Sequence, residues 1–210
     1  MENIFLAALK NDTLTLKEYL KFGDVNITDD TNSSLLHYAA RGNALEVANL
    51  LLDNYINLNI VNSSGETPLF EAINRGELGF CKILCRYNAN TSVVNKFGQT
   101  VYFKAILKGR IDIIELIEDF LKIDYEFTNP DGENALFYAL KAYNTKLFFR
   151  LARLYPNLLK ARNYENVNLA RFNRSNLDLT IQHNGNYYLI PEDEIKKYLS
   201  PEVQERYIPF

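Results

Sequence analysis

Two cysteines and two histidines are the residues of this chain whose chemistry could support metal binding. Cys81 and Cys85 are four residues apart, and this spacing places both side chains on one face of a helix. A zinc site needs further ligands with matching spacing, but His37 and His183 are the only histidines and lie far apart in the chain. We interpret both cysteines as reduced thiols in a packed helix, and we expect no metal and no cofactor.

The carboxylate pairs give no better support for catalysis. Asp112 with Glu115, and Asp193 with Glu194, fall on polar helix faces or helix starts, where acidic residues are favourable. The sequence contains no glycine-rich phosphate loop, no Gly-x-Ser-x-Gly elbow and no metalloprotease helix motif. We therefore expect a protein that is not an enzyme. The alternative, a metal-dependent or hydrolytic enzyme, would require metal that copurifies with the chain.

The composition is typical of a folded chain without a strongly charged surface. The chain has 210 residues, 47% of them hydrophobic, and a formal net charge of -3. This balance lacks the positive charge expected of a nucleic-acid-binding protein. The N-terminus has no positive region or cleavage site typical of a signal peptide, and no apolar run reaches membrane-spanning length. We expect a cytoplasmic monomer that binds neither nucleic acid nor a membrane.

A repeating pattern covers most of the chain. An alanine recurs in successive apolar segments at steps of 32, 33, 33 and 34 residues, and such a period indicates stacked repeats. A second apolar stripe with helical spacing follows each alanine after a short polar break. Each unit is thus predicted to be two short antiparallel helices, which bury their apolar faces only when the units stack. The recurring alanines are Ala7, Ala39, Ala72, Ala105 and Ala139.

The connections between units carry the residues that turns and helix starts need. Gly65, Gly98 and Gly132 occupy the same position in three successive units, where a turn favours a residue without a Cβ. Thr67 follows at the expected position of a helix N-cap, and Pro68 at the first helical position.

These residues resemble the ankyrin repeat family. Residues 64–72 (SGETPLFEA) are similar to the family signature G-x-T-P-L-H-x-A, and residues 36–47 (LHYAARGNALEV) match the following stretch. The resemblance implies an all-α repeat solenoid, which is a helix-turn-helix stack with β-hairpin fingertips. It covers residues 1–163, with repeats predicted at 1–28, 29–61, 62–94, 95–128 and 129–163. It also implies that His37 hydrogen-bonds backbone between repeats.

Residues 164–210 depart from the repeat and are predicted to form a C-terminal extension. Leu177–Ile181 alternates with period two, the turn residues 183–186 include His183, and Tyr187–Ile190 follows, which indicates a β-hairpin. Residues 191–199 and the segment after Ser200 are typical of helices. We interpret the extension as a small β-hairpin/helix cap over the open end of the stack. The alternative is a docking element, because residues 189–195 resemble the start of F-box-like tails that end some ankyrin proteins.

The resemblance also implies where a partner would bind. In ankyrin stacks the fingertips and the exposed end of each first helix line a continuous concave surface. The residues in these positions, which we predict to contact a partner, are Arg41, Ser64, Glu66, Asn74, Arg75, Lys96, Phe97, Gln99, Lys108, Asp131, Glu133 and Lys141.

Two features of these positions bear on the partner. Each repeat has one basic residue two or three positions after its recurring alanine, which predicts an acidic patch on the partner and salt-sensitive association. The alternative is that these are solvated residues at helix ends. The basic row is Lys10, Arg41, Arg75, Lys108 and Lys141.

Phe97 has no core to fill at a fingertip and is favoured as an interface anchor, unless it folds back on Tyr102 or Phe103.

The sequence therefore predicts a non-catalytic protein–protein interaction scaffold that binds a protein partner on its concave ankyrin surface. The alternative is an adaptor or host-directed effector whose C-terminal extension recruits a second partner. An effector would act in the cytoplasm of a host cell.

Overall fold

The described part of the chain is mostly helical and divides into two compact units. The structure is a computed structural model that describes residues 4–160, 171–173, 178–183 and 186–190. The two units are Met1–Ile123 and Asp124–Phe210. The predicted end of the repeats at residue 163 lies outside the described residues, so this boundary stays a prediction. Within the described residues, none of the helices is long and apolar enough to cross a membrane.

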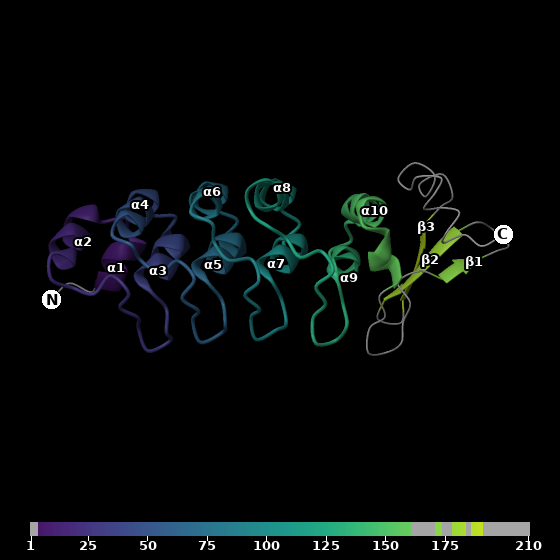
Figure 1. Cartoon of the computed structure of the whole chain (residues 1–210), viewed down its shortest axis with the longest axis horizontal. Coiled ribbons are helices and arrows are strands. Elements are labelled where there is room, and N and C mark those ends of the chain that lie inside the picture. The colour runs from purple at the N-terminus through teal and green to yellow at the C-terminus, as the bar shows by residue number, and fades with distance from the viewer. Residues whose placement is uncertain (1–3, 161–170, 174–177, 184–185, 191–210) are drawn as a thin grey trace. The chain divides into compact units, whose positions relative to one another are not determined.

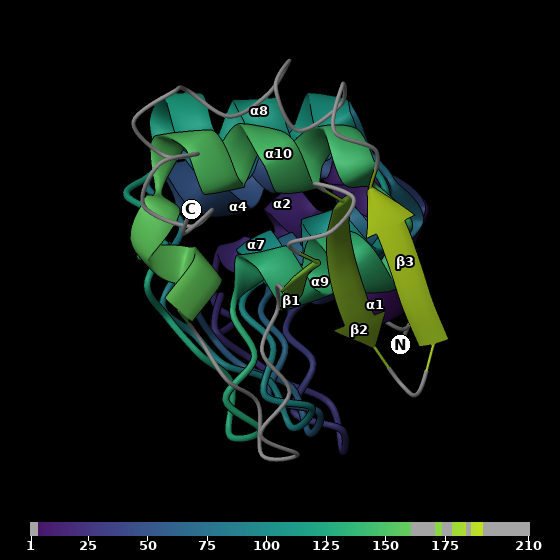
Figure 2. The same ribbon diagram turned by 90° about the vertical axis from the view of Figure 1, so that its right-hand side faces the viewer.

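The first unit consists of consecutive helix pairs arranged in two layers (Figures 1 and 2). The first helix of each pair packs against the first helix of the next pair, and the second helices do the same. This arrangement agrees with the predicted repeat of two short helices. The helices are α1 (Ile4–Leu9), α2 (Thr13–Leu20), α3 (Leu35–Gly42), α4 (Leu45–Asp53), α5 (Pro68–Arg75), α6 (Leu78–Arg86), α7 (Val101–Leu107) and α8 (Ile111–Phe120).

Small residues allow the first helices to approach closely. Ala39, Ala72 and Ala105 are fully buried in α3, α5 and α7. At Gly42 a Cβ atom would lie only 1.8 Å from the carbonyl oxygen of Leu9 at the end of α1, so no larger residue fits there without a shift of the backbone. The recurring alanines of the sequence are therefore explained by helix contact.

The loops that precede α3, α5 and α7 extend from the same side of the first-helix layer (Figure 1). The side chain of Asn62 closes one of these loops, because its Oδ1 accepts hydrogen bonds from the N–H groups of Ser64 (2.8 Å) and Glu66 (3.1 Å). Gly65 between them has φ +74°, as the turn prediction requires. Asn95 repeats this arrangement by accepting from the N–H groups of Phe97 and Gln99.

Backbone hydrogen bonds join successive loops. The N–H of Ser63 donates to the carbonyl oxygen of Thr31 at 2.7 Å, and the N–H of Lys96 donates to that of Ser64 at 3.0 Å. The predicted β-hairpin fingertips are not confirmed, because the described loop residues form one isolated bridge, Thr28 with Ser34, and no strand. Asn and Gly turns, rather than ladders of strand hydrogen bonds, fix the loop conformation.

Among its described residues, the second unit contains two α-helices, a 3-10 helix and a small antiparallel sheet in the order β1-β2-β3. The alternating pattern correctly predicted that β2 pairs with β3, and His183 at the end of β2 pairs with Asn186. The three residues of β1 are too few to show an alternation. The helices predicted after Pro191 lie outside the described residues, so the cap stays a prediction. The elements are α9 (Ala135–Lys141), α10 (Thr145–Leu154), a 3-10 helix (Pro156–Lys160), β1 (Arg171–Asn173), β2 (Asp178–His183) and β3 (Asn186–Ile190).

Two equivalent helix starts in the first unit differ in how their hydroxyl groups are satisfied. Ser34 precedes α3, and its Oγ lies 2.9 Å from Nδ1 of His37. Thr67 is the N-cap of α5, as predicted, but Phe70 takes the place of the histidine. The Thr67 hydroxyl is therefore buried without a hydrogen-bond partner among the described residues. Only the first of these hydroxyls contributes a hydrogen bond to the stack.

We predict that Ser34→Ala lowers the free energy of unfolding by about 1 kcal/mol, as expected for loss of a helix-start side chain. Thr67→Val, in contrast, should change it by less than about 0.5 kcal/mol, because an unpartnered buried hydroxyl is replaced by a methyl group of the same shape. Urea denaturation followed by circular dichroism measures both values. Equal losses in the two variants would contradict the assignment of these hydrogen bonds.

Candidate protein-binding surface

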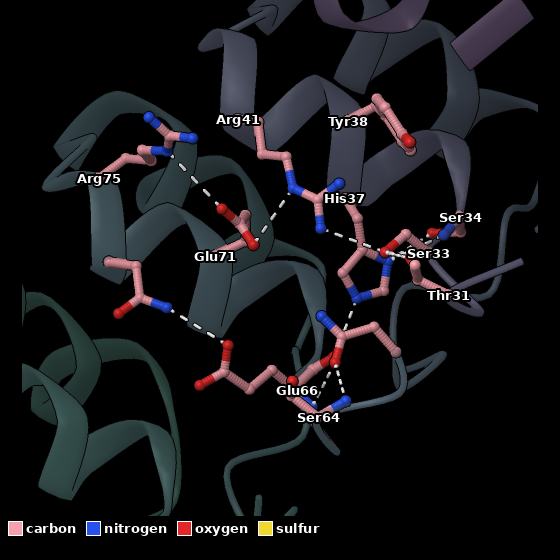
Figure 3. A network of polar contacts seen from close by, with 12 residues as sticks. Thr31, Ser33, Ser34, His37, Tyr38, Arg41, Ser64, Glu66, Glu71 and Arg75 are labelled. Carbon is pink, nitrogen blue, oxygen red and sulfur yellow. Dashed lines mark hydrogen bonds and ion pairs between the residues drawn. The ribbon is translucent and has the colours of Figure 1, made fainter. Parts of the chain in front are cut away.

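A carboxylate shared by two arginines is the central feature of the first-helix surface (Figure 3). Glu71 of α5 lies between Arg41 of α3 and Arg75 of α5. Its Oε2 is 3.4 Å from Nε of Arg41, and its Oε1 is 3.6 Å from Nε of Arg75. The Glu71 side chain is 13% exposed and the Arg75 side chain 55%. The carboxylate is thus covered, and the Arg75 guanidinium faces solvent.

Arg41 is held by two further contacts within its own repeat. Its Nη2 donates to Oγ of Ser33 at 3.1 Å, and its guanidinium carbon lies 4.9 Å from the centroid of the Tyr38 ring, a cation–π contact. With Glu71 on its remaining side, Arg41 has little freedom to contact a partner. This finding separates Arg41 from Arg75, although the sequence placed both in one basic row.

Glu66, which the sequence predicted to contact a partner, is buried. Its Oε1 accepts a hydrogen bond from Nδ2 of Asn95 at 3.1 Å and lies 3.6 Å from Nζ of Lys104, and its Oε2 accepts from Nδ2 of Asn74 at 3.3 Å. The carboxylate therefore links a loop to α5, α7 and the next loop. It is buried because stacking brings all these partners together.

Glu133 and Lys141 form the equivalent pair in the second unit, and Glu133, which was also predicted to contact a partner, is again buried. Asn129 donates to the same carboxylate at 3.1 Å. Nζ of Lys141 also lies 5.1 Å from the centroid of the Tyr138 ring. Like Arg41, Lys141 is engaged within the fold.

The remaining predicted residues differ in exposure. Phe97 is 68% exposed and does not fold back on Tyr102 or Phe103, which are buried. Asn74, Ser64 and Gln99 are half-buried, whereas the exposed residues are Lys10, Arg75, Lys96 and Lys108 in the first unit and Asp131 in the second.

His37 joins two repeats next to this network (Figure 3). Its Nε2 lies 2.9 Å from the carbonyl oxygen of Glu66, which confirms the cross-repeat hydrogen bond that the resemblance implied. A carbonyl only accepts, so Nε2 carries the proton and Nδ1 accepts from the N–H of Ser34 at 3.1 Å. Burial lowers the pKa of His37 below 6.5, although the bond to Glu66 acts in the opposite direction. The buried ring is therefore neutral at pH 7.

Sequence reasoning missed two residues of this surface, Glu71 and Lys104. Glu71 could have been found, because Glu71 and Arg75 are four residues apart and such pairs meet on one helix face. Lys104 carried no comparable signal, since its partner Glu66 is distant in the sequence and meets it only in the stack.

The two cysteines lie among the described residues and are buried thiols. Cys81 and Cys85 are free and buried in α6, as predicted. Burial raises the pKa of each thiol to about 12, so both are protonated at neutral pH. In the part of the chain that the structure describes, no group of three His, Cys, Asp or Glu residues could hold a metal ion.

Comparison with known families agrees with this architecture. Residues 4–95 match the model of ankyrin repeats in three copies. Residues 4–95 therefore contain ankyrin repeats, and such repeats in general serve as scaffolds for protein–protein interaction. The match covers the first three predicted repeats, and the predicted total of five is not confirmed by it. No curated protein matches the chain.

We predict that the thermal midpoint falls as the pH decreases below about 6.5, the ordinary pKa of histidine. Near this pH His37 takes up a proton in the unfolded chain. In the folded chain its lowered pKa keeps it neutral, so a fall in pH favours the unfolded state. Thermal melts at about pH 7.5 and about pH 5.5 measure the change. Asp29, whose hydrogen bonds from Tyr38 and Thr31 outweigh burial and lower its pKa to about 2, loses its contribution only below pH 3.8.

His37→Gln is the control for this pH dependence, because an amide side chain does not titrate. Its midpoint should change less over the same range than that of the wild-type chain. An identical change in both proteins would show that another group is responsible.

Proposed function

We propose that the chain is a non-catalytic scaffold that binds a protein partner through the first helices and loops of its first unit, the concave surface of an ankyrin stack. The observation that carries this proposal is Phe97, a large aromatic side chain that is 68% exposed at a loop tip. Exposed aromatic residues of this kind are favoured at the centres of protein interfaces.

The backbone around Phe97 supports this role because it is held in place. The N–H of Phe97 donates to Oδ1 of Asn95, and the N–H of Lys96 donates to the preceding loop. An anchor on a fixed loop loses little conformational entropy on binding. Burial of such a ring by a partner contributes about 1.5–3 kcal/mol.

Charge on the same surface favours an acidic partner. Arg75, Lys96 and Lys108 are exposed on neighbouring first helices and loops, whereas the carboxylates of Glu66 and Glu71 lie covered beneath them. A partner with an acidic patch would bind faster at low ionic strength. The proposed contact residues are Arg75, Lys96, Phe97 and Lys108, with Ser64, Asn74 and Gln99 at their margins.

We predict that Phe97→Ala weakens partner binding about tenfold or more, as expected for an anchor residue, and that Arg75→Glu weakens it and reduces its salt dependence. A partner captured from lysate and identified by mass spectrometry would be titrated against each purified variant by calorimetry. Both side chains are exposed, so the thermal midpoints should change little.

Two matched variants control for nonspecific effects. Phe22→Ala removes an aromatic residue that is 97% exposed just after α2 in the other helix layer, and Lys82→Glu reverses an exposed charge on α6. Neither should change the affinity. If the controls weaken binding as much as Phe97→Ala and Arg75→Glu, the partner uses a different surface.

A further inference from the structure

We infer that Arg75 receives a single carboxylate of the partner on its two Nη groups, and that Glu71 is the residue that positions it. This inference rests on the proposed function and specifies the chemistry of one contact. It starts from the way in which the two arginines share Glu71.

Among the described residues, the Arg75 guanidinium pairs with Glu71 through Nε. Nε is the Arg75 nitrogen that faces Glu71, at 3.6 Å from Oε1 (Figure 3). A guanidinium carries five N–H donors in a planar fork, and two parallel donors match the two oxygens of a carboxylate. Since the Arg75 side chain is 55% exposed, an incoming carboxylate can reach its guanidinium.

Glu71 fixes this edge without cancelling its charge. Its one carboxylate is divided between Arg41 and Arg75, so the group of three keeps an excess of positive charge. The Glu71 side chain is largely covered. It therefore does not compete with an acidic residue of the partner for the solvent-facing part of the Arg75 guanidinium. A guanidinium held in one orientation loses less entropy when it binds than a freely moving one.

The neighbouring cations favour a carboxylate side chain over the phosphate row of a nucleic acid. Nucleic acid is held by a row of unpaired cations, but Arg41 is paired with Glu71, and Lys104 is paired with Glu66. These pairs leave Arg75 as the exposed guanidinium of this network, with Lys108 exposed at the end of α7. The arrangement fits an aspartate or glutamate side chain of an acidic peptide.

The test uses the full chain and an N-acetylated, C-amidated hexaglutamate peptide as the probe. Titration at low salt, followed by NMR of the arginine Nε–H groups, should shift the signal of Arg75, assigned by its loss in Arg75→Lys. Arg75→Lys keeps the charge but loses the fork, and should weaken peptide binding about tenfold, the loss expected for one charge-assisted hydrogen bond. An Arg75 signal that does not move, or an Arg75→Lys variant that binds as the wild type does, overturns the inference.

Glu71→Gln separates positioning from simple charge. Removal of a negative charge should strengthen binding of an acidic peptide if only long-range attraction matters. If Glu71 positions Arg75, the same variant binds hexaglutamate more weakly, by about threefold, although its charge is more positive. Tighter binding by Glu71→Gln therefore overturns the positioning role, and the thermal midpoint of the variant shows that it is folded.

A single-stranded oligothymidylate tests the choice of ligand. The inference expects it to bind more weakly than hexaglutamate, and equal or tighter binding at Arg75 overturns the preference for a carboxylate. The proposed function can fail separately. If the partner binds Phe97→Ala and Arg75→Glu as tightly as the wild type, the proposed binding surface is wrong, even when hexaglutamate shifts the NMR signal of Arg75. Conversely, if partner binding depends on Phe97 but hexaglutamate does not shift the Arg75 signal, the binding surface is supported and the carboxylate contact is wrong.

Discussion

The close contact between successive first helices is the constraint on which the rest of the first unit depends. Buried alanines in α3, α5 and α7 and the absence of a Cβ at Gly42 allow this contact. It sets the spacing at which the Lys96 N–H meets the carbonyl oxygen of Ser64 and at which His37 reaches that of Glu66. One repeat could not satisfy these groups or bury its apolar faces alone, so each repeat is completed by its neighbour.

The same contact creates the chemistry of the first-helix surface. Side chains from three successive repeats converge on Glu66 and Glu71, and burial in the stack turns both carboxylates into supports for the cations above them. A polar network in which each member is hydrogen-bonded is rigid. Exposed Arg75 and Phe97 therefore stand on a fixed framework, which distinguishes them from flexible surface residues of the same types.

Much of the fold was predictable from particular residues. The alanine period gave the helix pairs, Thr67 and Pro68 marked the start of α5, and Gly65 marked a turn with positive φ. The binding surface was less predictable. The position of Glu66 in its repeat indicated exposure, yet three partners from other segments bury it, and Arg41 looked equivalent to Arg75 until Tyr38 and Ser33 were seen to hold it.

The sequence by itself determined the repeat, its helix pairs and its turns, because these depend on residue types a few positions apart and on their period. Only the tertiary structure decided which charges are covered and which face solvent. The Asn95 amide and the Glu66 carboxylate are 29 residues apart in the chain and meet at 3.1 Å only because two repeats stack. The spacing of residues within one repeat does not predict such contacts between repeats. These contacts decide which side chains stay exposed and can bind a partner.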